Sequence, residues 1–104
     1  MSETVTFVAC RDVRQARRIA RALVGERLAA CVNVVPGVAS IYRWKGKVEE
    51  AREALLLVKS TSSRAKRLEA RVKALHSYEL PELITLRIAG GSAAYLRWLR
   101  ESAR

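Results

Sequence analysis

The feature that most constrains this fold is a pair of long strand-like segments joined by a short turn in mid-chain. Residues 28–35 and 38–44 are rich in β-branched and aromatic side chains, and residues 48–60 resume the strand pattern after Lys45-Gly46-Lys47. Pro36-Gly37 interrupts the first segment. This predicts a bulge or bend and an edge strand, because proline cannot donate a ladder hydrogen bond.

Such a hairpin predicts self-assembly. Strands of about 12 residues extend roughly 40 Å at about 3.3 Å per residue, which is longer than a domain of this size can cover alone. An exposed apolar strand edge is an aggregation hazard unless another chain pairs with it. We therefore expect homo-oligomerisation through extension of the sheet.

Helical and strand patterns flank the hairpin. Residues 4–9 predict a strand ending near Cys10, and from Asp12, a candidate N-cap, apolar positions follow the helical period to residues 25–27. A second helical pattern follows candidate caps at residues 61–63.

This second helix ends near His76. Residues 83–88 then read as a fourth strand, and Ser92 caps a last short helix. The order βαββαβα predicts an α+β sandwich of the split βαβ type, an antiparallel sheet with helices on one face.

Length and composition fit one soluble domain spanning residues 1–104. The chain has 50% hydrophobic and 29% charged residues with few Gly and Pro, which excludes disorder. No signal peptide or membrane span is expected, so the sequence predicts a cytoplasmic protein without membrane association. Cys10 and Cys31 are expected to be free thiols.

The net charge of +10 raises the question of a nucleic-acid partner. The basic residues are spread over three predicted helices, a pattern typical of solvated helix faces, and no nucleic-acid-binding motif accompanies them. We therefore do not favour the hypothesis of nucleic-acid binding. It would be recognised by an affinity that falls steeply with salt.

Three segments, RLAACVNVVPG, SIYRWKGKVE and HSYELPE, closely resemble the CutA family of divalent-cation tolerance proteins, and the resemblance covers nearly the whole chain. It implies a ferredoxin-like fold, and a homotrimer in which long hairpins pair between subunits in a manner superficially like PII signalling proteins. It also implies a role in tolerance of copper and other divalent metals.

The family pattern carries over to a set of polar and aromatic positions. These are Cys31, Asn33, Tyr42, Trp44, Glu53, Lys59, Tyr78, Pro81 and Glu82. The chain departs from the pattern at Arg11, Lys45, Ser77 and Arg87. Positive charge at Lys45, Arg52 and Arg87 makes a cation site less favourable electrostatically.

Copper(II) or another divalent cation is the candidate ligand for Cys31 and His76, with Glu82 or Cys10 as further donors, because thiolate and imidazole suit copper. No local chelating spacing joins these residues. The alternatives are a small buried thiol at Cys31, a core or strand-end role for Cys10, and capping of a helix dipole by His76.

A second candidate site is a cleft between subunits for a small anionic or zwitterionic ligand, as in a PII-like metabolite sensor. The residues assigned to this cleft or to the subunit interface are Asn33, Tyr42, Trp44, Glu53, Lys59, Tyr78 and Glu82. Glu53 and Lys59 lie about 20 Å apart along one strand, so they could meet only across subunits. The alternatives are an ion-pair network fixing subunit register and packing of Trp44 against a neighbour.

No enzyme template is met, since the chain has one His, no phosphate loop and no nucleophile with an evident base and orienter. We therefore expect no catalytic residues. The leading hypothesis is a metal-tolerance homotrimer, and the rival is a metabolite sensor in which the metal is incidental.

Overall fold

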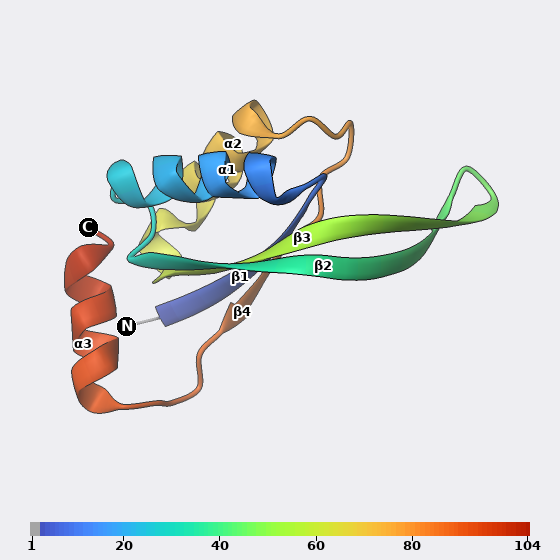
Figure 1. The fold of residues 1–104 in the computed structure, drawn as a ribbon. Coiled ribbons are helices and arrows are strands. Elements are labelled where there is room, and N and C mark those ends of the chain that lie inside the picture. The colour runs from blue at the N-terminus through green and yellow to red at the C-terminus, as the bar shows by residue number, and fades with distance from the viewer. Residues whose placement is uncertain (1–2) are drawn as a thin grey trace.

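A computed structural model describes residues 3–104, which form a four-stranded antiparallel sheet with three helices (Figure 1). The elements in chain order are β1 (Glu3–Cys10), α1 (Val13–Gly25), β2 (Cys31–Trp44), β3 (Lys47–Thr61), the short 3-10 helix η1 (Ser62–Arg64), α2 (Ala65–Leu75), β4 (Leu83–Arg87) and α3 (Ala93–Ser102). The predicted order of strands and helices is confirmed.

The sheet order is β2-β3-β1-β4, and every neighbouring pair is antiparallel. β3 lies between β1 and β2, and β1 lies between β3 and β4. Each βαβ unit is thus split by a strand of the other, which is the ferredoxin-like arrangement. The predicted fold class is confirmed.

Helices α1 and α2 cover one face of the sheet (Figure 1). The core between these layers is made of apolar side chains from all the elements involved. Its fully buried members include Val8, Ile19, Leu23, Leu56, Val58, Leu68 and Val72. Asp12 caps α1 as expected, since its Oδ1 accepts a 2.8 Å hydrogen bond from the Gln15 amide.

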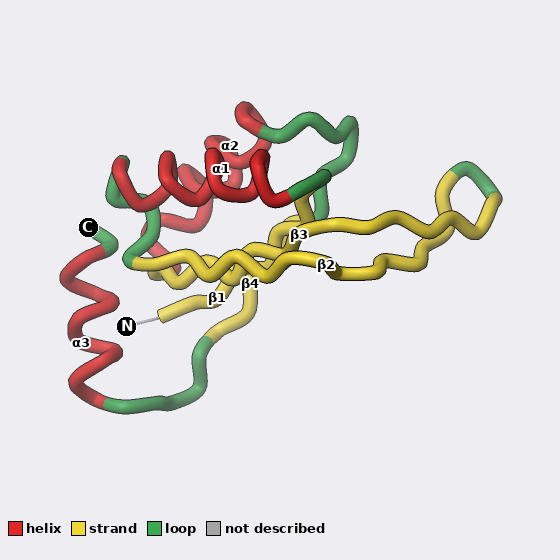
Figure 2. The backbone as a smooth tube through the Cα atoms, in the orientation of Figure 1, coloured by secondary structure: helices red, strands yellow, loops and turns green. Residues whose placement is uncertain are grey.

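The hairpin of β2 and β3 extends beyond the rest of the sheet (Figure 2). β1 ends at Cys10 opposite Ala54, so residues 38–53 pair only with one another. This hairpin overhang, residues 38–53, explains the 44 Å long axis of a molecule whose other extents are 25 and 22 Å. The prediction of a long projecting hairpin is confirmed.

The Pro36-Gly37 step forms the predicted bulge, with a register shift between Val35 and Val38. Gly37 has φ of +69°, a left-handed conformation that favours glycine. β2 is an edge strand, as its proline indicated.

Two local predictions were wrong. Residues 28–30 form a buried turn instead of extending β2, because Arg27 takes φ of +61° and the amides of Leu28 and Ala29 bond back to the Leu23 carbonyl. Residues 61–63 provide no side-chain cap for α2, because η1 intervenes and α2 begins without one.

The other face of the sheet carries no helix over its centre. Phe7, Leu57 and Ile84 lie in register across three strands on this open sheet face, and Leu86 lies beside them. Phe7 and Leu57 are half-buried, whereas Ile84 and Leu86 remain 50% and 48% exposed. A large apolar surface therefore faces away from α1 and α2.

α3 lies at the end of the sheet near the first described residues (Figure 1). Arg100 Nη1 donates to Glu3 Oε2 at 2.9 Å, and Leu99 packs with Ala30 and Ala103 in a second small core. No helix within residues 3–104 has both the length and the hydropathy that crossing a bilayer requires.

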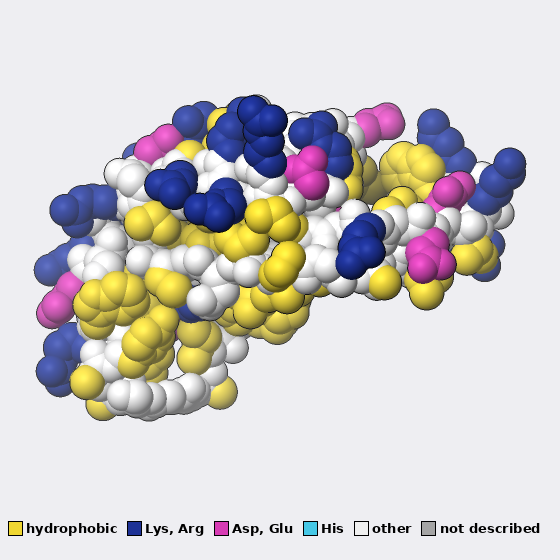
Figure 3. Space-filling view, viewed as in Figure 1, with side chains coloured by type: hydrophobic (Ala, Val, Ile, Leu, Met, Phe, Trp, Pro, Cys, Tyr) yellow, Lys and Arg dark blue, Asp and Glu magenta, His cyan; other side chains and the backbone are white. Residues whose placement is uncertain are grey.

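Lys and Arg side chains gather over the surface of α1 and α2 (Figure 3). Arg14, Arg17, Arg18 and Arg21 are all exposed on α1. The helix layer therefore presents a basic, solvated surface.

Candidate functional site

A cleft lies between the hairpin overhang and the connector, residues 76–82. It has a volume of about 920 Å³, which is within the range typical of small-molecule sites. The side chains that give it chemical character come from both walls. They are Tyr42, Trp44 and Glu53 on the hairpin and Tyr78, Glu79 and Glu82 on the connector.

The hairpin wall presents two rings and one carboxylate on a single face. Val38 pairs with Glu53, and Tyr42 and Trp44 follow Val38 at even spacing, so all of them point to the same side. Tyr42 and Trp44 remain 43% and 38% exposed, whereas Glu53 is only 9% exposed. Lys45 Nζ lies 5.9 Å from the Trp44 ring centroid.

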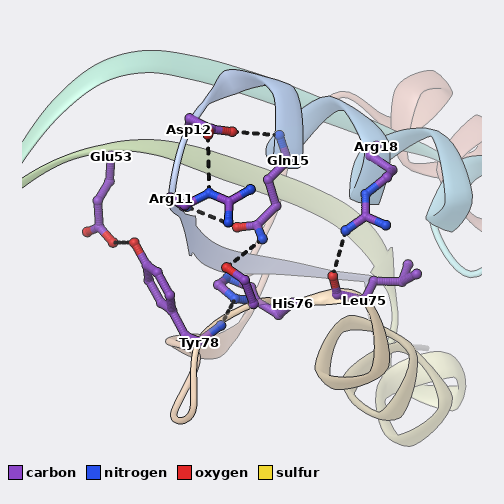
Figure 4. A network of polar contacts seen from close by, with 9 residues as sticks. Arg11, Asp12, Gln15, Arg18, Glu53, Leu75, His76 and Tyr78 are labelled. Atoms are coloured by element: carbon purple, nitrogen blue, oxygen red, sulfur yellow. Dashed lines mark hydrogen bonds and ion pairs between the residues drawn. The ribbon is translucent and has the colours of Figure 1, made fainter.

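A hydrogen bond joins the two walls. The Tyr78 hydroxyl donates to Glu53 Oε2 at 2.6 Å (Figure 4). Burial raises the pKa of Tyr78 well above its ordinary value, and the Glu53 carboxylate adds to this shift. Glu53 is the last residue of the overhang, next to Ala54, which pairs with the end of β1, so the bond fixes the connector to the base of the hairpin.

The connector is also anchored to the sheet by His76. The Nε2 atom of His76 lies 2.7 Å from the Ala9 carbonyl oxygen. Its Nδ1 accepts a hydrogen bond from the Tyr78 amide at 3.1 Å (Figure 4). Because Nδ1 accepts, the ring proton sits on Nε2 and is donated to Ala9. Both ring nitrogens are therefore engaged within the chain.

A third anchor ties the connector to α1. Gln15, only 2% exposed, donates from Nε2 to Ser77 Oγ at 2.7 Å and accepts the Arg11 amide at 3.0 Å (Figure 4). Sequence reasoning missed this role of Gln15 and Ser77. The available signal was the Asp12-x-x-Gln15 spacing, which matches a capping box at a helix start.

The structure does not bring the proposed metal ligands together in one chain. His76 has no free ring nitrogen. Cys31 lies on the edge strand β2 and Glu82 in the connector just before the other edge strand, β4, so they are separated by three strand spacings, about 14 Å, and by a further four residues along the strands. Cys31 is half-buried, and its Sγ lies 3.9 Å from the Tyr95 hydroxyl. Across residues 3–104, no three His, Cys, Asp or Glu side chains are grouped closely enough to hold a metal ion.

Asn33 and Lys59 do not line the cleft of their own chain. Lys59 Nζ donates to Asn33 Oδ1 on the open sheet face, beside the Cys31 end of β2. Lys59 and Glu53 therefore do not meet within one chain.

Cys10 is a core residue with no exposed surface. Burial, followed by the nearby Glu53 and Asp12 carboxylates, raises the pKa of its thiol to about 12. Such a thiol is a poor nucleophile and a poor metal ligand at neutral pH.

Comparison with known proteins gives consistent matches over nearly the whole chain. The family model described as CutA1 divalent ion tolerance protein matches residues 4–102. The divalent-cation tolerance protein CutA of Thermus thermophilus is 55% identical over 96% of this chain and 97% of its own length. The human protein CutA is 45% identical, and this chain spans 56% of its length.

Solved structures agree. The T. thermophilus divalent cation tolerance protein superposes with a TM-score of 0.96 at 54% identity, covering 98% of this chain and 99% of that one. CutA1 from Oryza sativa superposes with a TM-score of 0.97 at 42% identity, covering 100% of this chain and 95% of the other. An Archaeoglobus fulgidus structure named as a periplasmic divalent cation tolerance protein has a TM-score of 0.94 at 33% identity, covering 98% and 99%.

Proposed function

Because the chain belongs to the CutA1 divalent ion tolerance protein family, we propose that it acts in divalent-cation tolerance as a homotrimer that binds a small ligand in its cleft. Its family is one of non-enzymatic proteins, and the cleft is a binding site. The observation that carries the proposal is a 920 Å³ cleft whose wall is held rigid by three independent anchors. A rigid wall keeps binding groups in place before the ligand arrives.

Trimer formation is supported by the open sheet face together with the free edges of β2 and β4. Ile84 and Leu86 are too exposed for a stable monomer surface when they adjoin Phe7 and Leu57. Among the strands of residues 3–104, none pairs with the outer edges of the hairpin overhang beyond the end of β1. A second and third copy would cover both features.

The assembly is tested by measuring molar mass in solution with light scattering after size exclusion. The wild type is expected at three times the chain mass. Leu86→Asp places a charge on the open sheet face and is expected to shift the mass toward monomer. Val24→Asp, at a 41% exposed site on α1, is the matched control and should remain trimeric. A Leu86→Asp protein with unchanged mass at micromolar concentration would exclude this face as the interface.

We propose that the tolerance role does not depend on a copper site within one chain. His76 serves as a structural anchor. The side chains left for direct coordination are the Cys31 thiol and the Glu82 carboxylate, which lie apart in one chain and would need ligands from another subunit. Calorimetric titration with copper(II), and with zinc(II) in parallel, tests this. We expect His76→Ala to lower stability without changing copper affinity. One copper per chain, lost in both His76→Ala and Cys31→Ser, would overturn the proposal.

We also propose that the protein works in a reducing compartment such as the cytoplasm. Cys10 and Cys31 are both free thiols, which such a compartment maintains.

A further inference from the structure

We propose that the ligand of the cleft is a small organic cation carrying an ammonium group, held by the Glu53 carboxylate and the ring of Tyr42. This inference rests on the proposed function, since it names the ligand class of the same cleft. It differs from the small anionic or zwitterionic ligand that the sequence suggested for this site.

Charge is the first reason. The chain as a whole carries +10, yet the residues that line the cleft include Glu53, Glu79 and Glu82 and no Lys, Arg or His. The local sign is therefore opposite to that of the molecule. A cleft lined by one sign of charge concentrates ligands of the other sign, and here it repels anions.

The burial of Glu53 is the second reason. A carboxylate that is only 9% exposed is costly unless a cation or several donors compensate it. Among residues 3–104, the donor to Glu53 is the Tyr78 hydroxyl at Oε2, while Oε1 receives no hydrogen bond and no Lys or Arg forms an ion pair with this carboxylate. A ligand ammonium at Oε1 would supply the missing positive charge.

The aromatic wall is the third reason. Tyr42 and Trp44 share the face of Glu53, and ammonium groups are attracted to the faces of such rings within about 6 Å. The Trp44 ring already has the Lys45 ammonium at 5.9 Å, at the outer end of the hairpin. Across residues 3–104, the carboxylates are too dispersed to hold a compact metal ion. Tyr42 lies opposite Glu49, four residues or about 13 Å along the strand from Glu53, so these two long side chains can converge on one organic cation. Trp44, opposite Lys47, lies about 20 Å from Glu53 and forms the outer part of the wall.

The test is a calorimetric titration of the assembled wild-type protein with three probes. Choline is the cation, 3,3-dimethylbutan-1-ol is its uncharged isostere, and malonate is the anion. Choline is expected to bind at least about tenfold more tightly than the isostere, since both share shape and only one carries charge. Malonate is expected not to bind in the cleft.

Matched variants locate the site. Glu53→Gln removes the charge but keeps the shape and is expected to weaken choline binding about tenfold or more. Glu50→Gln makes the same change three residues away on the opposite face of β3 and is expected to leave the affinity within about twofold. Tyr42→Leu is expected to weaken choline binding without changing the charge of the cleft at neutral pH, so the inference can still be tested if Glu53→Gln does not assemble.

Four outcomes would overturn the inference. Equal binding of choline and its isostere would show that charge is not recognised. Choline affinity that survives both Glu53→Gln and Tyr42→Leu would place the cation elsewhere. Malonate binding that is lost in Tyr42→Leu would show that the cleft binds an anion, which refutes the cation but leaves cleft binding intact. No binding of any probe would count against the proposed function as well.

Discussion

Removal of the Tyr78 hydroxyl is the most direct way to test how the cleft is built. Tyr78→Phe keeps the ring and deletes the 2.6 Å hydrogen bond to Glu53. The Glu53 carboxylate then keeps its 9% exposure but loses the hydrogen-bond donor that the chain gives it. The expected effect is a loss of stability that originates at Glu53.

The magnitude follows from the type of bond. A hydrogen bond to a charged group contributes about 1.5–3 kcal/mol, and leaving a buried acceptor unsatisfied costs a similar amount. Since one carboxylate oxygen is affected and the residue keeps some solvent contact, we expect a loss of about 2 kcal/mol per chain. This is well outside the error of denaturant unfolding at a fixed protein concentration.

The assay is a double-mutant cycle on urea unfolding. If the energy resides in the bond, Tyr78→Phe costs about 2 kcal/mol in the wild type and much less in Glu53→Gln, where no carboxylate remains. Tyr95→Phe is the control, because its exposed hydroxyl makes only a 3.9 Å sulfur contact. Its cost should stay within about 0.5 kcal/mol. Equal costs of Tyr78→Phe in both backgrounds would refute the reasoning, because the loss would then come from ring packing.

Three further predictions concern the same elements. Because the pKa of Tyr78 is raised by folding, the unfolded state loses its phenolic proton at a lower pH than the folded state. The stability contributed by this group is therefore complete below about pH 10 and declines above it. In urea unfolding at increasing pH, the free energy of unfolding should fall less steeply with pH in Tyr78→Phe than in the wild type. Cys10 has a thiol pKa of about 12 and no exposed surface. In a Cys31→Ser background it should therefore react with Ellman's reagent only as fast as the protein unfolds. A rapid reaction of the native state would contradict its burial. Leu56→Ala removes a side chain from a fully buried central position and leaves a cavity. It should lower the free energy of unfolding by about 2–5 kcal/mol, measured by calorimetry or urea unfolding. A loss below about 1 kcal/mol would mean that the core collapses into the cavity.

The elements could be predicted from sequence because their signals are local. Alternation and helical periodicity depend on neighbours a few residues apart, and the Asp12 cap and the Pro36-Gly37 bulge are set by single residues. The error at residues 28–30 has a different origin. Their β-forming composition was overridden by Arg27 in the left-handed region, which turns the chain back onto the end of α1.

The site was predictable in its members but not in its connections. Tyr42, Glu53 and Tyr78 were selected by resemblance, yet the bond between Glu53 and Tyr78 depends on how far β3 runs past β1. The engagement of both His76 nitrogens likewise depends on the fold, since Ala9 lies 67 residues away. Sequence alone identifies a ligand type, whereas only the tertiary structure shows whether its lone pairs are already used.

The bulge at Pro36-Gly37 affects how deletions in β2 can change the cleft during evolution. Before it, Val32 and Val34 face the helices, and after it the even-numbered residues Tyr42 and Trp44 face the other way, toward the cleft. Deleting one residue between Val35 and Val38 would remove the bulge and leave Val38 opposite Glu53, so Tyr42 and Trp44 would still face the cleft. Deleting one residue just after Val38, with the strand pairing kept, would instead turn Ile41 and Arg43 toward the cleft. That second deletion would replace the two rings by an aliphatic and a basic side chain without any substitution, so a short deletion can alter what this hairpin recognises more than a point mutation can.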